Sequence, residues 1–375
     1  MRGFNFDKNI IIKLSYGLLV LVFIFLCFNN QKEKVTLYPT NVEIEEETKK
    51  LEVTKEDNIE QIVGINNSLS DFYLNLKGFE GDLQVTHPKV ISFDKKWNGY
   101  KYWIAYTPYP KGDQAKENPH VLSSNDLINW KEKKGYKNPL DIPEDKDSRY
   151  VYNSDTHLVY NNDLDRLECY WRYVNDKEDL VIIYRRTTRD GIHWTEKEEV
   201  LKSTRSKKDY LSPTIIYENH IYRYWYVDKD RKVKYMEYDT INKEWSKSVI
   251  IDIKYANPNL ESWHLDLIKT DKGYEIVIVA FDGWKKRSKM SLYYTYSEDN
   301  INYTEAIPIL SSPNNGGIYR SSILFLNNTY YIFYSEITNT YKRGVGIMYG
   351  TDIEKLNGLK IKDIGKFMQY IKVNG

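Results

Sequence analysis

The chain has 375 residues, of which 41% are hydrophobic and 29% charged, so it is long enough to bury a substantial core. Its 54 basic and 53 acidic residues nearly cancel, and this balance gives no electrostatic signature of a nucleic-acid-binding protein. The two cysteines, Cys27 and Cys169, predict neither a disulfide framework nor a cysteine-based metal site.

The N-terminal segment is predicted to be a membrane anchor. An almost unbroken apolar run extends from Ile10 to Phe28, and the basic residues Arg2 and Lys8 precede it. A helix of this length approaches the roughly 30 Å thickness of a bilayer core. Because basic residues stay on the cytoplasmic side, and no small-residue cleavage site follows, we expect residues 1–28 to form a cytoplasmic tip and an uncleaved transmembrane signal anchor. The protein would then be a single-pass cell-membrane protein with an extracytoplasmic domain.

Residues 29–78 are expected to be a stalk or linker, because they contain the charge cluster EIEEETKK and little apolar periodicity. Residues 79–375 are expected to form one folded domain. No stretch after residue 80 has the apolar periodicity of a convincing amphipathic helix.

A strand pattern is repeated five times in this domain. Short runs rich in Tyr, Trp, Ile and Val, with apolar and polar residues alternating, favour strands over helices. Five copies of such a unit predict an all-β fold, a five-bladed β-propeller. The first strands are expected at 85–93, 154–160, 210–217, 262–268 and 319–325, the second at 100–109, 167–174, 222–228, 274–282 and 329–336, and the third segments at 117–130, 179–194, 233–245, 290–303 and 344–352.

Three of the copies end in a similar hairpin. Each has Ser or Thr, one further residue, Asp, and an aromatic residue four positions after the Asp. An Asp side chain in such a turn accepts hydrogen bonds from nearby backbone amides, so these aspartates are predicted to be structural. The hairpins are Ser124, Asp126 and Trp130; Thr188, Asp190 and Trp194; and Ser297, Asp299 and Tyr303.

Polar residues recur at the openings of the five copies. Aligning these openings places His87, His157, Ser212, His264 and Ser321 at equivalent positions. In a propeller these positions converge near the central axis, and convergent polar groups mark candidate sites. Asp155, Asp266, Trp263 and Arg320 flank them in the sequence.

The chain resembles the five-bladed propeller clan of glycoside hydrolases that includes family 43 arabinanases and xylosidases and the family 32 invertases. The resemblance covers residues 80–350 and rests on blade number, on openings such as THPKVISF and LSPTIIY, and on the SxDxxxW-type hairpins. It implies a base Asp in blade one, a pKa-tuning Asp in blade two and an acid Glu in blade three. Asp155 matches the blade-two position, but His87 stands at the blade-one position and Ser212 at the blade-three position.

Two functions remain open on this pattern. The first is a membrane-anchored glycoside hydrolase-like enzyme acting on a polysaccharide or envelope glycan, since glycosidases need an acid and a base carboxyl. The second is a carbohydrate-binding or envelope scaffold propeller without catalysis. The predicted catalytic residues are Asp155, Asp266 and Glu117, and the predicted substrate-binding residues are His87, His157, Ser212, Trp263, His264 and Arg320.

The sequence requires no cofactor for either function. As an alternative, the three histidines and a carboxylate would bind a divalent metal such as Zn or Mn, because imidazole and carboxylate ligands suit these ions. Arg320 is expected to hold an anionic group of the glycan. The expected partners are a carbohydrate and, through the N-terminal helix, a membrane, with no nucleic acid.

Overall fold

The computed structural model describes residues 65–78, 81–145, 148–283, 290–311, 316–338 and 343–374. In these residues the chain forms five antiparallel sheets that follow one another in sequence, here called blades 1 to 5. Within each blade consecutive strands are neighbours, except that the last strand of blade 3, Val249–Ile251, pairs with the third strand, Val233–Asp239.

The strand bounds of the blades are as follows. Blade 1 contains β1 (Val85–Trp97), β2 (Tyr100–Pro108) and β3 (His120–Ser124), and blade 2 contains β4 (Val151–Asn161), β5 (Arg166–Asn175), β6 (Leu180–Thr188) and β7 (Glu198–Thr204). Blade 3 contains β8 (Leu211–Glu218), β9 (Ile221–Val227), β10 (Val233–Asp239), β11 (Glu244–Trp245) and β12 (Val249–Ile251). Blade 4 contains β13 (Glu261–Thr270), β14 (Gly273–Phe281), β15 (Ser291–Ser297) and β16 (Ile307–Ser311), and blade 5 contains β17 (Gly317–Leu326), β18 (Thr329–Ile337), β19 (Arg343–Gly350) and β20 (Asn357–Gly358).

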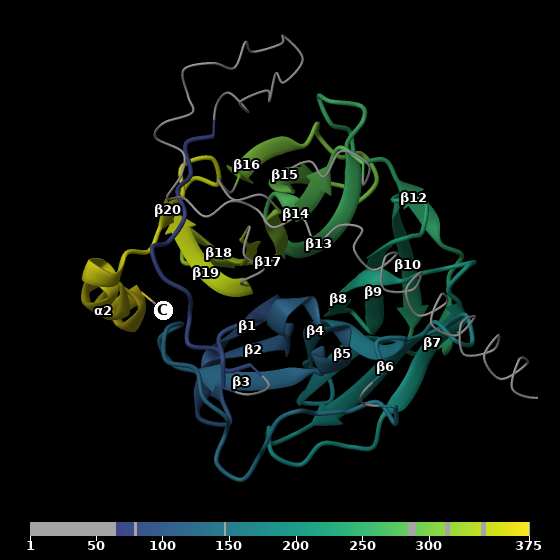
Figure 1. Ribbon diagram of the computed structural model, residues 1–375. Helices are drawn as coiled ribbons and strands as arrows, with labels where there is room; N and C mark the ends of the chain where they lie inside the picture. The colour runs from purple at the N-terminus through teal and green to yellow at the C-terminus, as the bar shows by residue number, and fades with distance from the viewer. Residues whose placement is uncertain are drawn as a thin grey trace, which may run out of the picture. The chain divides into compact units, whose positions relative to one another are not determined.

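The all-β five-bladed propeller predicted from the sequence is confirmed. The first strands β1, β4, β8, β13 and β17 contact one another in a closed ring, and Figure 1 shows them innermost, with the later strands farther out. Third strands are shorter than predicted because the Asp-containing turn begins at their last residue, as at Ser124 and Ser297.

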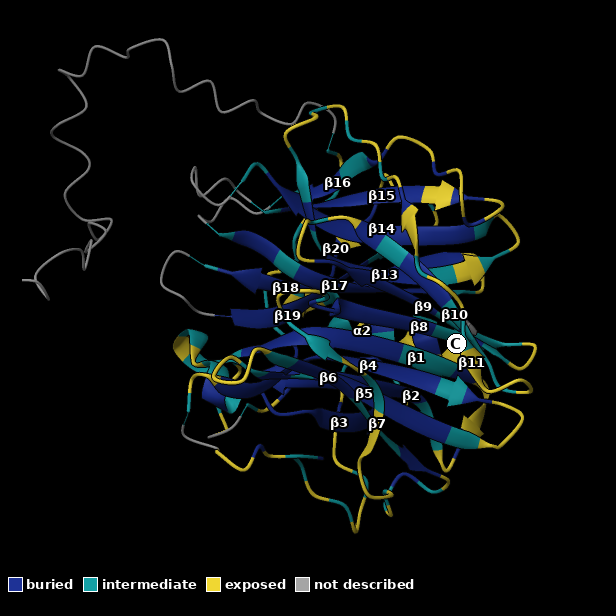
Figure 2. Cartoon of the chain, turned by 90° about the vertical axis from the view of Figure 1, so that its right-hand side faces the viewer, coloured by how far each residue is buried: buried dark blue, intermediate teal, exposed yellow. Residues whose placement is uncertain are grey.

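The inner and second strands are buried on both faces because each blade is packed between two others. The segment YEIVIVAF of β14 is therefore an almost continuous apolar run, and all eight of its residues, from Tyr274 to Phe281, are buried. Figure 2 shows that the buried residues fill the blades, whereas exposed residues gather in the connections. A strand buried on both faces need not alternate in polarity.

Residues 65–78 belong to the propeller, which corrects the expected stalk boundary at residue 78. The amide of Leu74 donates to the carbonyl of Val345 at 2.8 Å, and Leu74 and Leu76 are buried in the core between blades 1 and 5. The segment passes so close to β20 that a Cβ at Gly358 would lie 2.1 Å from the carbonyl carbon of Leu69. It therefore joins the first and last blades across the point where the ring closes.

The chain also contains a helix that the sequence interpretation missed. Strand β20 is followed by a 3-10 turn, Ile361–Asp363, and by helix α2, Ile364–Asn374. Phe367 and Ile371, four residues apart on one face, are buried in the cluster that includes Trp130. Eleven residues give only two such core positions, so the apolar period was too short to recognise.

Among the described residues no helix is long and apolar enough to cross a bilayer. Residues 1–28, where the anchor is expected, and residues 29–64 of the expected stalk lie outside them.

Candidate functional site

Matching irregularities in β1, β4 and β8 position the site. In each strand the pairing register shifts near its start, and the residue at the shift has a positive φ: 53° at His87, 50° at Asp155 and 58° at Ser212. Such φ values are uncommon for residues other than glycine. They cost free energy, so they persist only where the surrounding contacts enforce them. The three first strands are irregular at the same level of the propeller. Because a bulge changes the direction of a side chain, these irregularities determine where the three side chains point.

This register corrects the alignment made from the sequence. His87 is equivalent to Asp155 and Ser212, whereas His157 lies two residues farther along β4, where regular pairing has resumed. The histidine spacing alone could not reveal this, because the equivalent positions are defined by the pairing of each first strand with its neighbour, and that pairing is not encoded in the order of polar and apolar residues.

His87, Asp155 and His264, here called the axial cluster, converge on one carboxylate oxygen. Oδ1 of Asp155 lies 3.4 Å from Nε2 of His87 and 3.2 Å from Nδ1 of His264. One potential ligand atom from each of the three residues lies within 4.8 Å of the others. Arg320 adds a hydrogen bond of 3.0 Å from Nη1 to the same oxygen. All four side chains are buried.

Burial determines the charge state of the axial cluster. It lowers the pKa of His87 to about 3 and also lowers the pKa of His264 well below its usual value, so both imidazoles are neutral near pH 7. Burial alone would raise the pKa of Asp155, but the neighbouring histidines and arginines outweigh it and hold that pKa below its usual range. A carboxylate thus faces two neutral imidazoles.

Several polar atoms of the site are buried without a hydrogen-bond partner among the described residues. They are Nε2 of His87, both ring nitrogens of His264, and Oε1 of Glu117. An unsatisfied buried polar atom costs about 1–3 kcal/mol, so such a concentration calls for a ligand that satisfies it. Two neutral imidazole nitrogens and a carboxylate are a donor set suited to a divalent transition metal.

Glu117 lies beside the axial cluster, just after the short 3-10 turn Gln114–Lys116. Its Oε1 is 3.6 Å from Nδ1 of His87, and that nitrogen also contacts the Thr107 hydroxyl at 2.9 Å. Burial and, next, the charge of Asp155 raise the pKa of Glu117 well above its usual value. The two buried carboxyls therefore have opposite proton affinities, with the His87 ring between them.

Aromatic rings border the axial cluster. The Tyr319 ring lies 5.5 Å from that of His87 and 4.9 Å from that of His264, and Trp263 lies 5.1 Å from His264. The Arg231 guanidinium stacks on Trp263 at 4.5 Å. Rings of this kind can stack on the apolar faces of a sugar.

Sequence reasoning missed four neighbours of the cluster. Tyr109 contacts Tyr319 at 6.3 Å between ring centroids, Arg343 stacks on Tyr109 at 4.2 Å, and Arg172 lies 4.0 Å from Asp155. Tyr319 directly precedes Arg320, so an aromatic residue beside a candidate was a usable signal. Tyr109, Arg343 and Arg172 lie outside the first strands, and no feature of the repeat pattern identified them as site residues.

Four predicted site residues have structural contacts instead. Asp266 accepts two hydrogen bonds from Nζ of Lys89, at 2.7 Å and 2.9 Å, and a third from the amide of Ile323. His157 contacts the backbone of Ile215 at 3.0 Å.

Ser212 bonds to the backbone of Leu265, which joins blades 3 and 4. Arg320 is occupied by Asp155 and the Pro213 carbonyl, so it positions the carboxylate of Asp155 rather than standing open to an anionic glycan group.

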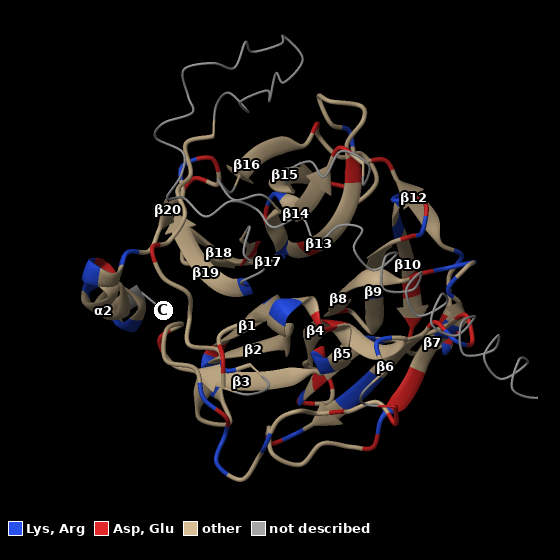
Figure 3. Ribbon diagram, in the orientation of Figure 1, with Lys and Arg blue, Asp and Glu red and all other residues tan. Residues whose placement is uncertain are grey.

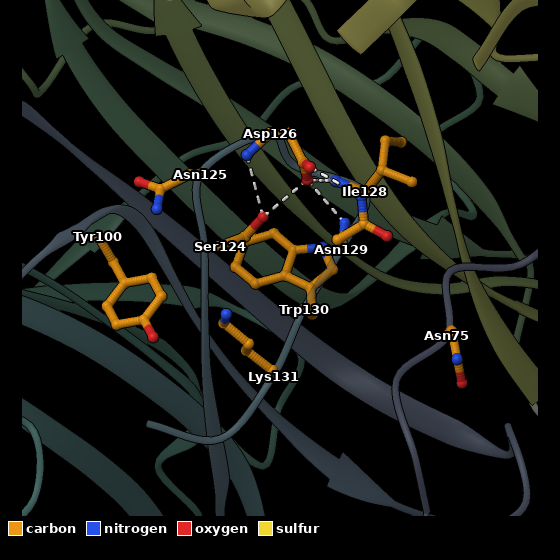
Figure 4. Close-up of a pocket in the computed structure, with 9 residues that line it drawn as sticks. All are labelled: Asn75, Tyr100, Ser124, Asn125, Asp126, Ile128, Asn129, Trp130 and Lys131. Atoms are coloured by element: carbon orange, nitrogen blue, oxygen red, sulfur yellow. Dashed lines mark hydrogen bonds between the residues drawn. The ribbon is translucent and has the colours of Figure 1, made fainter. Parts of the chain in front are cut away.

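The prediction that the hairpin aspartates are structural is confirmed. Oδ1 of Asp126 accepts from the amides of Ile128 and Asn129, as Figure 4 shows, and Asp190 and Asp299 accept the equivalent pairs. The first hairpin also lines a pocket of about 370 Å³ together with Tyr100 and Lys131. Its Asp is already saturated by the turn, so this pocket offers no free carboxylate.

Comparison with known proteins supports the fold. No protein-family profile matches the chain. A curated relative, the A type blood N-acetyl-alpha-D-galactosamine deacetylase of Flavonifractor plautii, is 27% identical over 296 residues, which cover 65% of this chain and 38% of that protein. The chain thus spans well under half the length of this relative.

Solved structures share the propeller. An N-acetylgalactosamine deacetylase from F. plautii, in complex with blood group B trisaccharide, matches with a TM-score of 0.65 and 22% identity, covering 80% of this chain and 96% of that one. A mutant α-L-arabinanase of Cellvibrio cellulosa matches with a TM-score of 0.54 and 12% identity over 78% and 98% of the two chains. A family 43 β-1,3-galactosidase matches with a TM-score of 0.51 and 11% identity over 74% and 60%. The predicted resemblance to the family 43 propellers is confirmed as a likeness of fold.

Proposed function

We propose that this propeller is a metal-dependent deacetylase of N-acetylated amino sugars. The observation that carries the proposal is the axial cluster: two neutral buried imidazoles and a carboxylate with ligand atoms within 4.8 Å. Nε2 of His87 and both ring nitrogens of His264 have no hydrogen-bond partner in the described ranges. The similarity to a deacetylase acting on N-acetylgalactosamine supports the same reaction class.

His87, Asp155 and His264 would hold the divalent metal. A metal in such a site polarises the amide carbonyl and lowers the pKa of a bound water. Arg320 keeps Asp155 ionised and oriented, because its guanidinium donates to Oδ1 at 3.0 Å. The Thr107 hydroxyl contacts Nδ1 of His87 at 2.9 Å, which fixes the ring and leaves Nε2 toward Asp155.

Glu117 is proposed to move the proton. In deacetylation the water oxygen bonds to the acetyl carbon, the carbon–nitrogen bond breaks, and the sugar nitrogen receives a proton, giving acetate and a free amine. Glu117 would take the proton from the water at Oε1 and return it to the departing nitrogen. The raised pKa of Glu117 favours its protonated form, so the carboxyl would keep the proton taken from the water until it is returned to the nitrogen.

The bordering rings would bind the sugar. Trp263 and Tyr319 flank His264, so a pyranose placed against them would present its substituent to the axial cluster. Asp266, His157 and Ser212, whose polar atoms are engaged elsewhere in the fold, are not assigned to substrate.

Glycoside hydrolysis by Glu117 and Asp155 is the second candidate, favoured by their opposite pKa shifts. The His87 ring contacts both carboxyls and occupies the space in which a glycosidase places the anomeric carbon. This arrangement favours deacetylation.

The two reactions give different products. The full chain would be incubated with N-acetylgalactosamine and N-acetylglucosamine glycosides, with Mn²⁺ or Zn²⁺ and with a chelator. Acetate and free amine formed only with metal would support the proposal. Reducing ends without acetate would replace it by glycoside hydrolysis, and sugar binding with neither product would replace it by a binding protein.

We also propose that residues 1–28 tether the domain to a membrane, with the propeller on the extracytoplasmic side. The proposal rests on the apolar run Ile10–Phe28 and the basic residues before it. Fractionation and protease accessibility of intact cells test it. A chain that stays in the soluble fraction, or that protease cannot reach from outside, would contradict it.

A further inference from the structure

A second pocket lies between blades 2 and 3. It has a volume of about 250 Å³ and takes side chains from both blades, including Tyr170, Arg185 and Glu198 of blade 2 and Tyr224, Tyr238 and Trp245 of blade 3. Its size is just below the range of about 300–1,000 Å³ typical of small-molecule sites, so it suits one sugar ring rather than an oligosaccharide.

The pocket combines aromatic faces with a polar floor. Tyr238 and Trp245 line the pocket, are half-buried, and have ring centroids 5.1 Å apart. Below them Tyr170 and Tyr222 are buried, and their hydroxyls donate to the carboxylate of Glu168 at 2.7 Å and 2.9 Å. Aromatic walls with hydrogen-bonding groups at fixed positions are the usual chemistry of sugar binding.

Two polar atoms of the lining are left without a partner within the described part of the chain. The Tyr224 hydroxyl is one, on a residue that is only 1% exposed. The other is Nε of Arg185, whose Nη2 already donates to Glu198 at 2.7 Å. A hydroxyl can both donate and accept, and a guanidinium nitrogen can donate, so both groups have the hydrogen-bonding roles that the hydroxyl groups of a sugar complement.

The charges around the pocket are paired. Arg185 contacts Glu168 and Glu198, Arg166 contacts Glu168, and Lys202 contacts Glu199. Figure 3 shows the resulting mixture of basic residues on β6 and acidic residues on β7. Three positive groups against three carboxylates leave no net charge for an ionic ligand, which favours a neutral one.

Tyr222, which lines the pocket, lies toward the end of the blades away from the axial cluster. Tyr222 pairs with Tyr217 near the end of β8, whereas Ser212, at the level of the axial cluster, is near the start of that strand. We propose that this pocket, here called the inter-blade pocket, binds one neutral sugar ring and forms a carbohydrate site separate from the axial cluster. A site there would hold a glycan to the protein independently of its turnover.

Saturation-transfer NMR on the full chain carrying Asp155→Asn tests this, because that substitution disables the axial cluster. The probes are the methyl glycosides of galactose, glucose, N-acetylgalactosamine and N-acetylglucosamine. At least one is expected to bind with a Kd of about 1–10 mM. Trp245→Ala is expected to weaken it at least fivefold, and the control Tyr296→Ala, an exposed tyrosine in blade 4, is expected to leave it unchanged.

Tyr224→Phe is the decisive variant, since it keeps the ring and removes only a hydroxyl that has no partner elsewhere in the described residues. A weakening of at least threefold with unchanged thermal unfolding supports the proposal. The proposal is overturned if Tyr224→Phe leaves binding unchanged. It is also overturned if none of the probes binds at about 20 mM. Acetate release by the chain with Asp155 intact is measured in parallel, so a failure of this site is distinguishable from a failure of the deacetylase assignment.

Discussion

His264 and Asp266 lie two residues apart on β13, are both 1% exposed, and were both predicted to serve the site, yet their surroundings are opposite. Asp266 has both carboxylate oxygens filled by Lys89, with a further hydrogen bond from the Ile323 amide. His264 has no hydrogen-bond partner on either ring nitrogen among the residues that the structure describes. The carboxylate of Asp266 is satisfied within the fold, whereas the ring nitrogens of His264 have the arrangement expected of proposed ligands.

The difference extends to the groups around each residue, here called the Asp266 layer, which is Asp266 with Lys89, and the axial cluster. In the Asp266 layer a buried positive charge meets a buried negative one, and removing either leaves the other uncompensated. In the axial cluster a carboxylate meets neutral imidazoles with unpaired nitrogens, a costly arrangement that the proposed cation would stabilise. Burial and polarity are therefore poor guides to function here, whereas hydrogen-bond satisfaction separates the two layers.

The largest effect is expected from His264→Gln. Loss of an imidazole ligand should remove several kcal/mol of transition-state stabilisation, so turnover should fall by at least about 10³-fold. The unfolding free energy should change by no more than about 1 kcal/mol, because no hydrogen bond of the described chain is lost. Acetate release and chemical denaturation measure the two quantities. If His264→Gln loses stability but retains turnover, then His264 has a structural role and is not part of the reactive site.

Asp266→Asn should give the reverse result. It leaves the buried Lys89 ammonium without its counter-charge, which typically costs about 3–5 kcal/mol of unfolding free energy. Metal affinity of the folded protein should be retained. Denaturant titration measures the loss, and the double variant Lys89→Met with Asp266→Leu should recover part of it. A stable Asp266→Asn protein without activity would make Asp266 part of the site.

Glu117→Gln sharpens the comparison within the site itself. Because Glu117 is proposed to carry the proton and not to hold the metal, kcat should fall by about 10²-fold or more. Metal affinity, measured by calorimetry, should change by less than about threefold. If metal affinity falls in parallel with kcat, Glu117 instead orients His87, from which it lies 3.6 Å.

The smallest effect concerns His120, a buried histidine that has a partner. Its Nδ1 lies 2.8 Å from the Asn118 carbonyl, and burial lowers its pKa to about 4. Above about pH 6.5 the ring is neutral in both states and its contribution to stability is complete. As pH falls from about 6.5 toward 4, the unfolded state binds a proton that the folded state does not, so stability falls, by about 2 kcal/mol at pH 5.

His120→Asn should remove this contribution and make the pH dependence less steep, since His87 and His264 still contribute in the same direction. The unfolding free energy at pH 8 should stay within about 1 kcal/mol of that of the unsubstituted chain. Denaturation at pH 8, 6 and 5 compares the two proteins. An equal loss of stability in both on acidification would show that His120 does not contribute.

Strands and blade number were predictable because each blade repeats the same local signals. The segment YEIVIVAF and the hairpins at Asp126, Asp190 and Asp299 specify strands and turns with no information from distant residues. The closing segment at residues 65–78 and helix α2 were not predictable, since only the packing of blades 1 and 5 against them stabilises either one.

The site was predictable in composition but not in grouping. Asp155, His87, His264 and Glu117 were all candidates, and the structure brings them together. His157 and Asp266 were candidates on the same grounds, but His157 lies two residues beyond Asp155 and contacts the Ile215 backbone, and Asp266 is paired with Lys89. Both depend on pairing between distant segments, and no local pattern encodes that pairing.

Anomalous diffraction from crystals of the full chain soaked in Mn²⁺ tests the central claim most directly. We expect one strong peak at metal–ligand distances of about 2.0–2.2 Å from a ring nitrogen of His87, a ring nitrogen of His264 and the Asp155 carboxylate. The peak should be absent in crystals of His264→Gln. An axial cluster without a peak in the unsubstituted protein, with Mn²⁺ bound elsewhere or not at all, would contradict the claim.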